Sequence, residues 1–278
     1  MSTTAEPKSR ALSVSPLADA LDLPARQARF SRLCEEALRH RHEPGLAGIG
    51  TLGEKRLHAV IKHYLTENED YHEVGFPDCR FVADVAFDDA IYEVQTGSFA
   101  PLREKIAYYL ANTDRTVTVV HPVAAVRRMS WVDRADGSVT PPRRVAGERP
   151  RDLLPALYPL IPYLSDRRLR FRLLLIETQD FRLLDDKKSR RAGHRRGGKL
   201  DRVPIALLDD LTFSVPRDYL SLLPSPLPDE PFPVKQFARQ TGIYGVDSYS
   251  AVRVLCALGL LRPAEPAGRA MTFARTEV

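Results

Sequence analysis

Two short runs of apolar residues, separated by only two residues, constrain the fold of this chain more than any other feature. Residues 81–87 and 90–95 are rich in Val, Ala, Phe, Ile and Tyr, and only Asp88 and Asp89 lie between them. A two-residue connection between two such runs is typical of a tight β-hairpin. The sequence therefore predicts an antiparallel pair of strands at this point.

The register of this hairpin places two acidic residues opposite each other. With Asp88 and Asp89 as the turn, Asp84 pairs with Glu93, and their Cβ atoms are expected roughly 5 Å apart. Like charges in this position repel, so the pairing is reasonable where a cation lies between the carboxylates. Since side chains alternate along a strand, Gln95 points to the same face as Glu93. Two acids and an amide on one face indicate a metal-dependent phosphodiesterase site.

The spacing of these residues, an Asp on one strand and Glu93-Val94-Gln95 on the next, resembles the PD-(D/E)xK superfamily of restriction-endonuclease-like nucleases. Most members of that superfamily carry Lys at the position of Gln95, and some carry Gln. The resemblance implies that Asp84, Glu93 and the Val94 carbonyl hold Mg²⁺ or Mn²⁺, since hard cations prefer oxygen ligands. It also implies that Gln95 helps to position the attacking water.

The sequence around the hairpin predicts the order of elements that this superfamily has. Helical periodicity indicates one helix before the hairpin and one after it, and apolar or β-branched runs indicate two further strands. In chain order, the expected elements are a helix at 51–66, strands at 71–76, 81–87 and 90–95, a helix around 102–110 and a strand at 116–121. This order matches the αβββαβ core that the resemblance implies, an α/β fold with a mixed central sheet.

Two further residues near the hairpin have alternative interpretations. Glu54, at the start of the first helix, would be a third acid of the site, or it would close a capping box with Thr51. Lys105, on the helix after the hairpin, would replace the lysine that the motif lacks. The preferred interpretation of Lys105 is a solvated lysine on a helix surface, because most surface lysines have no specific partner.

Composition excludes several classes of protein. The chain has 278 residues, 44% of them hydrophobic, which is enough for one large domain and a small one. Its three cysteines are scattered without metal-ligand spacing, so neither a disulfide framework nor a zinc site is expected. The sequence has no apolar run of membrane-spanning length and no signal peptide, and we therefore expect a cytoplasmic protein without a membrane partner.

The chain divides into four expected parts. Residues 1–16 are expected to form a disordered tail, and residues 17–223 a nuclease-like domain that starts with an amphipathic helix. Residues 224–231 are rich in proline and are expected to form a stiff linker. In residues 232–278, two short helices with a glycine-bearing turn resemble a helix-turn-helix of winged-helix type.

Two groups of residues are expected to contact nucleic acid. The first is a flexible basic loop at 187–202, which suits binding to a phosphate backbone, although such a run is often only solvated. Its candidate contacts are Arg190, Arg191, Arg195, Arg196 and Lys199. The second group lies in the winged-helix-like module, where Ser248, Tyr249 and Arg253 would face the groove of DNA. The alternative for this module is a protein contact, including the formation of a homodimer.

A strand is also expected at Arg168–Leu175, where arginines alternate with apolar residues. Since successive side chains of a strand point to opposite faces, these arginines share one face. That face is expected to be basic and in contact with solvent.

These features favour a divalent-metal-dependent endonuclease that hydrolyses phosphodiester bonds of nucleic acid, with DNA a better fit than RNA. The alternative is a catalytically inactive nuclease fold, which would act as a nucleic-acid-binding regulator through its C-terminal module. The presence of both Asp84 and Glu93 favours the enzyme.

Overall fold

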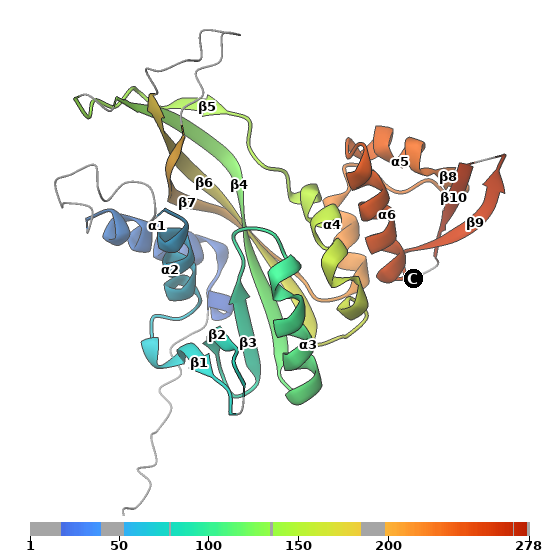
Figure 1. Ribbon diagram of the computed structural model, residues 1–278, viewed down its shortest axis with the longest axis horizontal. Helices are drawn as coiled ribbons and strands as arrows, with labels where there is room; N and C mark the ends of the chain where they lie inside the picture. Colours follow the sequence, from blue (N-terminus) through green and yellow to red (C-terminus); the bar gives the residue numbers. More distant parts are fainter. Residues whose placement is uncertain are drawn as a thin grey trace, which may run out of the picture.

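The computed structural model describes residues 18–39, 53–77, 79–133, 136–184, 198–268 and 270–276. Within these residues the chain is a mixed α/β protein, with helices on both faces of a large sheet and a smaller sheet near the C-terminus (Figure 1). The expected tail at 1–16 lies outside the described residues. Within the described part of the chain, we find no helix that is long and apolar enough to cross a membrane.

The large sheet combines parallel and antiparallel strands. Its strands are β1 (His72–Gly75), β2 (Val82–Ala86), β3 (Ala90–Val94), β4 (Thr116–Asp133), β5 (Arg143–Val145), β6 (Leu169–Leu184) and β7 (Lys199–Phe213). In the described residues their order is β1-β2-β3-β4-β6-β7, and the short β5 pairs with β4. β4 is parallel to both β3 and β6, and the other pairs are antiparallel.

Helices on the two faces of this sheet enclose two separate cores. One face is covered by α1 (Leu23–Arg39) and α2 (Gly53–Leu65), and the other by α3 (Arg103–Asn112), α4 (Leu153–Ala156) and the 3₁₀ helix η6 (Tyr158–Tyr163). The other short 3₁₀ helices are η1 (Ala18–Ala20), η3 (Glu69–Tyr71), η4 (Ala100–Leu102), η5 (Pro150–Asp152) and η7 (Pro216–Leu222).

The start of β4 is buried on both faces of the sheet. Val117 and Val119 lie in the core under α3, whereas Val120 lies in the core under α1 and α2. Successive side chains point to opposite faces, so a strand that is covered on both faces needs apolar residues at consecutive positions.

The predicted hairpin and its register are confirmed. Val85 pairs with Tyr92 and Ala86 with Ile91, and the backbone N–H of Phe87 donates to the Ala90 carbonyl at 2.7 Å. The expected order of helix, three strands, helix and strand over residues 51–121 is confirmed as well. This order brings the first half of β2, the end of β3 and the first turns of α3 together.

The expected solvent contact of the basic face at Arg168–Leu175 is wrong at Arg172. Arg172 is only 2% exposed, and its guanidinium donates to both carboxylate oxygens of Asp210, at 2.7 and 2.5 Å. The Tyr64 hydroxyl donates to the same carboxylate at 2.5 Å, and Arg26 lies 3.4 Å from it. Because α1 and α2 cover this face, the arginine forms an internal ion pair instead of a solvated surface.

The expected basic loop at 187–202 ends earlier than predicted. β7 already begins at Lys199, and the backbone N–H of Leu183 donates to the Gly198 carbonyl at 3.1 Å, which joins the ends of β6 and β7. Arg190, Arg191, Arg195 and Arg196 lie outside the described residues, as does the side chain of Lys199. The structure therefore locates only the two ends of this basic segment.

The C-terminal module consists of two helices and a small antiparallel sheet. Its elements are β8 (Phe232–Pro233), α5 (Val234–Thr241), α6 (Val246–Ala257), β9 (Leu261–Ala267) and β10 (Ala270–Arg275), and its strand order is β8-β10-β9. α6 packs against α4 and η6. Phe237 and Leu255 belong to the same apolar core as Leu154 and Leu160 of the large domain. Leu227 of the proline-rich segment is buried in this core too, so the segment packs against its surroundings.

Candidate functional site

Asp84 lies at the point where β2 and β3 separate. Its Oδ2 accepts the backbone N–H of Val94 at 2.7 Å, so a side chain replaces a backbone acceptor of the sheet. His58 of α2 places its Nε2 3.2 Å from the same oxygen. Burial opposes ionisation, but the hydrogen bonds and charges of His58, Val94 and Lys105 outweigh it and hold the pKa of Asp84 below its usual value. Asp84 is therefore ionised at neutral pH.

Glu93 is the most deeply buried acid of this region, with an exposed fraction of 1%. Its Oε2 lies 2.6 Å from Nζ of Lys105, and its Oε1 accepts the Tyr109 hydroxyl at 3.0 Å. Burial and the nearby charge of Asp84 raise the pKa of Glu93 to about 7, in spite of the contacts with Lys105 and Tyr109. Continuing the hairpin register from Val85 places Asp84 opposite Glu93, as the sequence predicts.

The preferred interpretation of Lys105 as a solvated surface lysine is wrong. Its side chain is only 19% exposed, and it turns inward from α3 to contact Glu93. Tyr109 lies one turn further along the same helix and contacts the other oxygen of Glu93. Residues four apart on a helix share one face, so α3 supplies one cation and one hydroxyl to the same carboxylate.

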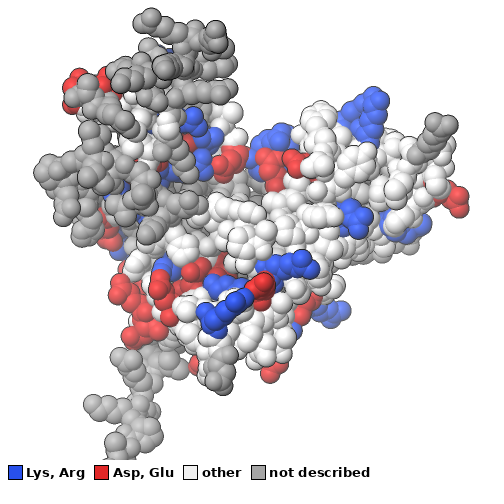
Figure 2. Space-filling view, in the orientation of Figure 1, with Lys and Arg blue, Asp and Glu red and all other residues white. Residues whose placement is uncertain are grey.

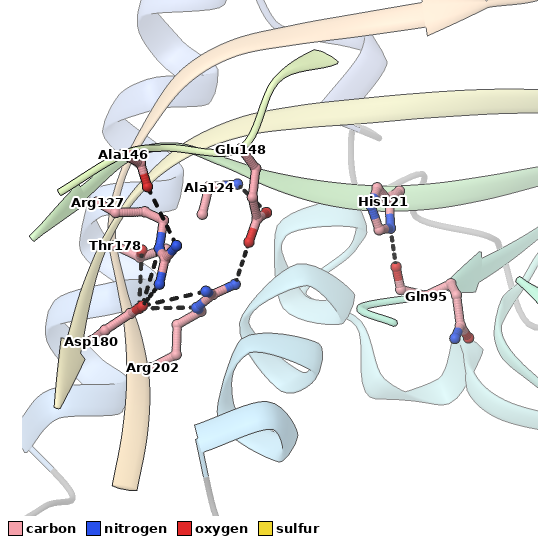
Figure 3. A network of polar contacts seen from close by, with 9 residues as sticks. All are labelled: Gln95, His121, Ala124, Arg127, Ala146, Glu148, Thr178, Asp180 and Arg202. Carbon is pink, nitrogen blue, oxygen red and sulfur yellow. Dashed lines mark hydrogen bonds and ion pairs between the residues drawn. The ribbon is translucent and has the colours of Figure 1, made fainter. Parts of the chain in front are cut away.

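Gln95 does not join the contacts of the two acids. Its side-chain Nε2 donates to the Ser98 carbonyl at 2.6 Å, and its backbone N–H donates to the Val120 carbonyl at 2.9 Å. The Gln95 carbonyl accepts Nδ1–H of His121 at 2.5 Å (Figure 3). Burial lowers the pKa of His121, so its ring is neutral and keeps this proton. The amide of Gln95 thus fixes the loop after β3.

Two residues of this site were not singled out by sequence reasoning. They are His58, which contacts Asp84, and Tyr109, which contacts Glu93. A signal for His58 existed, because it lies four residues after Glu54 and therefore on the same face of α2. The backbone of Glu54 is part of α2, but its side chain lies outside the described residues.

The oxygen atoms of this site provide some of the ligands that a hard divalent cation needs. Asp84 and Glu93 provide carboxylate oxygens, and their mutual repulsion would be relieved by a cation between them. In the part of the chain that the structure describes, no group of three or more His, Cys, Asp or Glu side chains is arranged to hold a metal ion. A metal here would therefore rely on these two acids, on backbone oxygen such as the Val94 carbonyl, and on water.

A second polar network lies further along β4 and is arranged differently (Figure 3). Asp180 of β6 accepts hydrogen bonds from both Arg127 and Arg202, and Arg202 also donates to Glu148 at 2.9 Å. Burial opposes ionisation of Asp180, yet its two arginines hold its pKa below the usual value. This network links three strands to the segment that leads into η5. Arg202 belongs to the basic segment 187–202, but its guanidinium is bound within this network and is not available to contact phosphate.

The residues expected to face DNA from the C-terminal module divide into two groups. Tyr249 is 62% exposed on α6, and Arg253, one turn later, is exposed as well. Ser248 is a correction, because it is only 3% exposed and its hydroxyl donates to the Gly245 carbonyl at 2.7 Å. Ser248 closes the turn before α6 and does not face solvent.

The chain belongs to the family described as Domain of unknown function (DUF8091), which matches residues 55–214. The match covers all strands of the large sheet and contains Asp84, Glu93 and Lys105, whereas the C-terminal module lies beyond it. No curated protein and no solved structure matches the chain.

Proposed function

We propose that this protein is a divalent-metal-dependent nuclease of the PD-(D/E)xK type. The observation that carries the proposal is the meeting of Asp84, Glu93 and Lys105 at one end of a β-hairpin, with Lys105 Nζ 2.6 Å from Glu93. Two acids on adjacent strands and one lysine are the groups that this superfamily uses. The order of elements around them, helix, three strands, helix and strand, supports an αβββαβ core.

The residues of the site have distinct roles in this proposal. Asp84, Glu93 and the Val94 carbonyl would hold Mg²⁺ or Mn²⁺, and Glu54 would approach from α2. When bound, the ion would lower the pKa of a water molecule and neutralise charge on the scissile phosphate. The backbone N–H of Val94 and the ring of His58 fix the orientation of the Asp84 carboxylate. Preorganised ligands of this kind avoid the cost of reorientation during the reaction.

Lys105 takes the role that the motif usually gives to its last residue. The amide of Gln95 is engaged by Ser98 and carries no charge, whereas the ammonium of Lys105 already lies at the acid pair. A lysine on a flexible stem can move between a carboxylate and a phosphate oxygen. Lys105 therefore neutralises Glu93 in the resting state and would contact the phosphate when substrate binds.

Two features favour DNA or another nucleic acid as the substrate. The segment between β6 and β7 carries six lysines and arginines within residues 187–196, which suits contacts to phosphates. The C-terminal module has the order strand, helix, helix, strand, strand, which supports the winged-helix interpretation. Each of these regions would contact the backbone of a nucleic acid that the site cleaves.

The test is incubation of the purified protein with single- and double-stranded DNA and RNA, in Mg²⁺, in Mn²⁺ or in EDTA. We expect cleavage in the presence of either metal and none in EDTA, with products that carry 5′-phosphates. Absence of cleavage on all four substrates in both metals would contradict the proposal.

A catalytically inactive, nucleic-acid-binding regulator is the second candidate. One observation favours it, because the Gln95 amide is held by Ser98 and Lys105 already neutralises Glu93, so the acid pair can persist without metal. This candidate predicts binding of nucleic acid with no cleavage under any metal condition. The same assay, combined with a binding measurement, therefore separates the two candidates.

A further inference from the structure

Three large hydrophobic side chains that are exposed to solvent lie in one six-residue segment of the C-terminal module, residues 244–249. Tyr244 is 65% exposed, Val246 78% and Tyr249 62%. We call these three residues the aromatic platform. Val246 and Tyr249 lie three residues apart on α6, and Arg253 follows four residues later, so they form one outward stripe. The opposite side of α6 is buried, with Ala251, Val252 and Leu255 almost inaccessible to solvent.

The turn that carries Tyr244 is held on both sides. Gly242 and Gly245 both adopt positive φ, at 68° and 63°, a conformation that glycine reaches without strain. Between them Ile243 is buried at 3% exposure and anchors the turn, so Tyr244 is directed into solvent. Ser248 closes the far end by donating its backbone N–H, at 3.2 Å, and its hydroxyl to the Gly245 carbonyl.

The large domain braces this turn as well. Nη1 of Arg149, which precedes η5, lies 3.4 Å from the Gly242 carbonyl and donates to it. A Cβ at Gly242 would lie only 3.1 Å from Nη2 of Arg151. Tyr244 is therefore exposed on a braced turn and Tyr249 on a helix whose opposite side is buried, which reduces the entropy that a partner must remove on binding.

The charges of the two helices indicate the kind of partner. Residues 234–257 contain three cations, Lys235, Arg239 and Arg253, and one acid, Asp247, and all four are exposed. None of the three cations forms an ion pair with another described residue. Figure 2 shows Lys and Arg on the C-terminal module separated by uncharged surface. A partner that matches this surface carries negative charge and flat apolar faces together.

We propose that the aromatic platform binds single-stranded nucleic acid, with unpaired bases stacked on Tyr244 and Tyr249 and phosphates near Arg253. Unpaired nucleotides combine these two properties, because every base has a flat face and every linkage carries a negative charge. A duplex fits less well, since base edges in a groove are recognised by polar side chains, whereas the aromatic platform presents Val246 and two tyrosines. The inference rests on the proposed function for its choice of nucleic acid, and it assigns single strands or unpaired ends as the preferred ligand.

The test measures fluorescence anisotropy of labelled oligonucleotides of about 15 nucleotides in EDTA, where no cleavage occurs. Single-stranded DNA should bind about tenfold more tightly than a duplex of the same length. Replacing both tyrosines by Leu should weaken single-strand binding about tenfold or more, whereas replacing both by Phe should preserve it, because Phe keeps the aromatic face. Tyr158→Leu on η6, at a tyrosine that is 44% exposed elsewhere, is the matched control and should bind like the wild type.

Three outcomes would overturn the inference. They are equal or tighter binding of the duplex, unchanged single-strand binding by the double Leu variant, and a concentration-dependent dimer that the Tyr244→Ala, Tyr249→Ala variant loses in sedimentation. The last outcome would assign the platform to contact with a second copy of the chain. Failure of the proposed function is separate, because it appears as absence of cleavage in Mg²⁺ and Mn²⁺ while single-strand binding in EDTA is unaffected.

Discussion

Two groups of buried acids in the large sheet differ in how their charge is balanced. Asp210 receives two hydrogen bonds from Arg172 and has Arg26 3.4 Å away, so one carboxylate faces two guanidinium groups. At the hairpin, by contrast, the two carboxylates of Asp84 and Glu93 share one ammonium, that of Lys105, and the ring of His58. The first group has a surplus of positive charge, and the second has a surplus of negative charge.

The difference indicates which group maintains the fold and which is available for chemistry. Arginine is always charged and binds a carboxylate with two parallel hydrogen bonds, which suits a permanent ion pair. Lysine is a single point charge on a flexible stem, and it can exchange partners. Burial and the nearby charge of Asp84 raise the pKa of Glu93 to about 7, and the contact with Lys105 does not offset them. A fold that tolerates this cost has a site that a further cation would stabilise.

The largest expected effect is the loss of cleavage when either acid of the hairpin is neutralised. Asp84→Asn and Glu93→Gln should each reduce the cleavage rate by about a thousandfold or more, because metal binding and phosphate neutralisation both depend on them. Both variants should fold, since each removes one of two repelling charges. Rates in Mg²⁺ and thermal unfolding in EDTA measure these effects. Asp88→Asn, in the exposed turn of the same hairpin, is the control and should retain activity. Full activity of the Asp84 variant would remove this pair from the proposed site.

The second effect is on stability and concerns the arginine-rich group. Arg172→Met should destabilise the protein by about 3–5 kcal/mol, because it leaves the Asp210 carboxylate buried with too few partners. Replacing both residues by apolar ones, as in Arg172→Met with Asp210→Leu, should recover much of that loss. Urea unfolding measures both variants. A loss below about 1 kcal/mol for Arg172→Met would mean that the two groups do not differ as described.

The hairpin and its acid pair could be predicted from the sequence for a simple physical reason. A two-residue turn fixes the register, and the register alone decides which residues lie opposite each other. Asp84 and Glu93 therefore follow from a stretch of fifteen residues, 81–95, without knowledge of the rest of the fold.

The sequence contains a signal that Lys105 points inward, but the prediction followed the general tendency of lysines to lie in solvent. Lys105 lies four residues before Tyr109 and three after Leu102, both of which are buried, so it borders the apolar stripe of α3. The residue type of Lys105 favoured an exposed side chain, whereas its position on α3 favoured a side chain that points into the interior. The position was the better guide, because Glu93 offers a partner inside.

The burial of Arg172 could not be predicted from its own strand. Alternation shows that the arginines of residues 168–175 share a face, but it does not show what covers that face. The cover comes from α1 and α2, and the counter-ion Asp210 is 38 residues away in the sequence. Similarly, the predicted strand at 116–121 is only the start of β4, which continues to Asp133 through Pro122, a residue that usually indicates the end of a central strand.

The third prediction tests whether Lys105 acts at the site or only neutralises Glu93. Lys105→Met should reduce the cleavage rate by about ten- to a hundredfold, because a cation near the phosphate is lost. Gln95→Ala should have a smaller effect, since the Gln95 amide is bonded to Ser98. The informative readout is the pH profile, because removal of the ammonium should shift the ionisation of Glu93 to higher pH. Equal rates for Lys105→Met and the wild type would assign water activation and phosphate contact to other groups.

The smallest expected effect is a loss of stability with rising pH that Glu93 produces at the hairpin site. The pKa of Glu93 is about 7 in the folded protein, against an ordinary value of 4.5. The folded state therefore binds this proton more tightly than the unfolded state, and its stabilising effect is complete below about pH 4.5 and lost as the pH rises through 7. Relative to Glu93→Gln, the wild type should lose stability between pH 5 and pH 8 in EDTA, by at most a few kcal/mol since one pKa unit corresponds to about 1.4 kcal/mol. Mg²⁺ should restore part of this loss at pH 8 in the wild type but not in the variant, because a ligand of the folded state stabilises it.

Asp180 gives the opposite behaviour, since its lowered pKa contributes stability that is lost as the pH falls below its ordinary value of 3.8. If the stability of the wild type and of Glu93→Gln changed with pH in parallel, Lys105 alone would balance the two acids. The contrast between the hairpin site and the Asp210 group would then disappear.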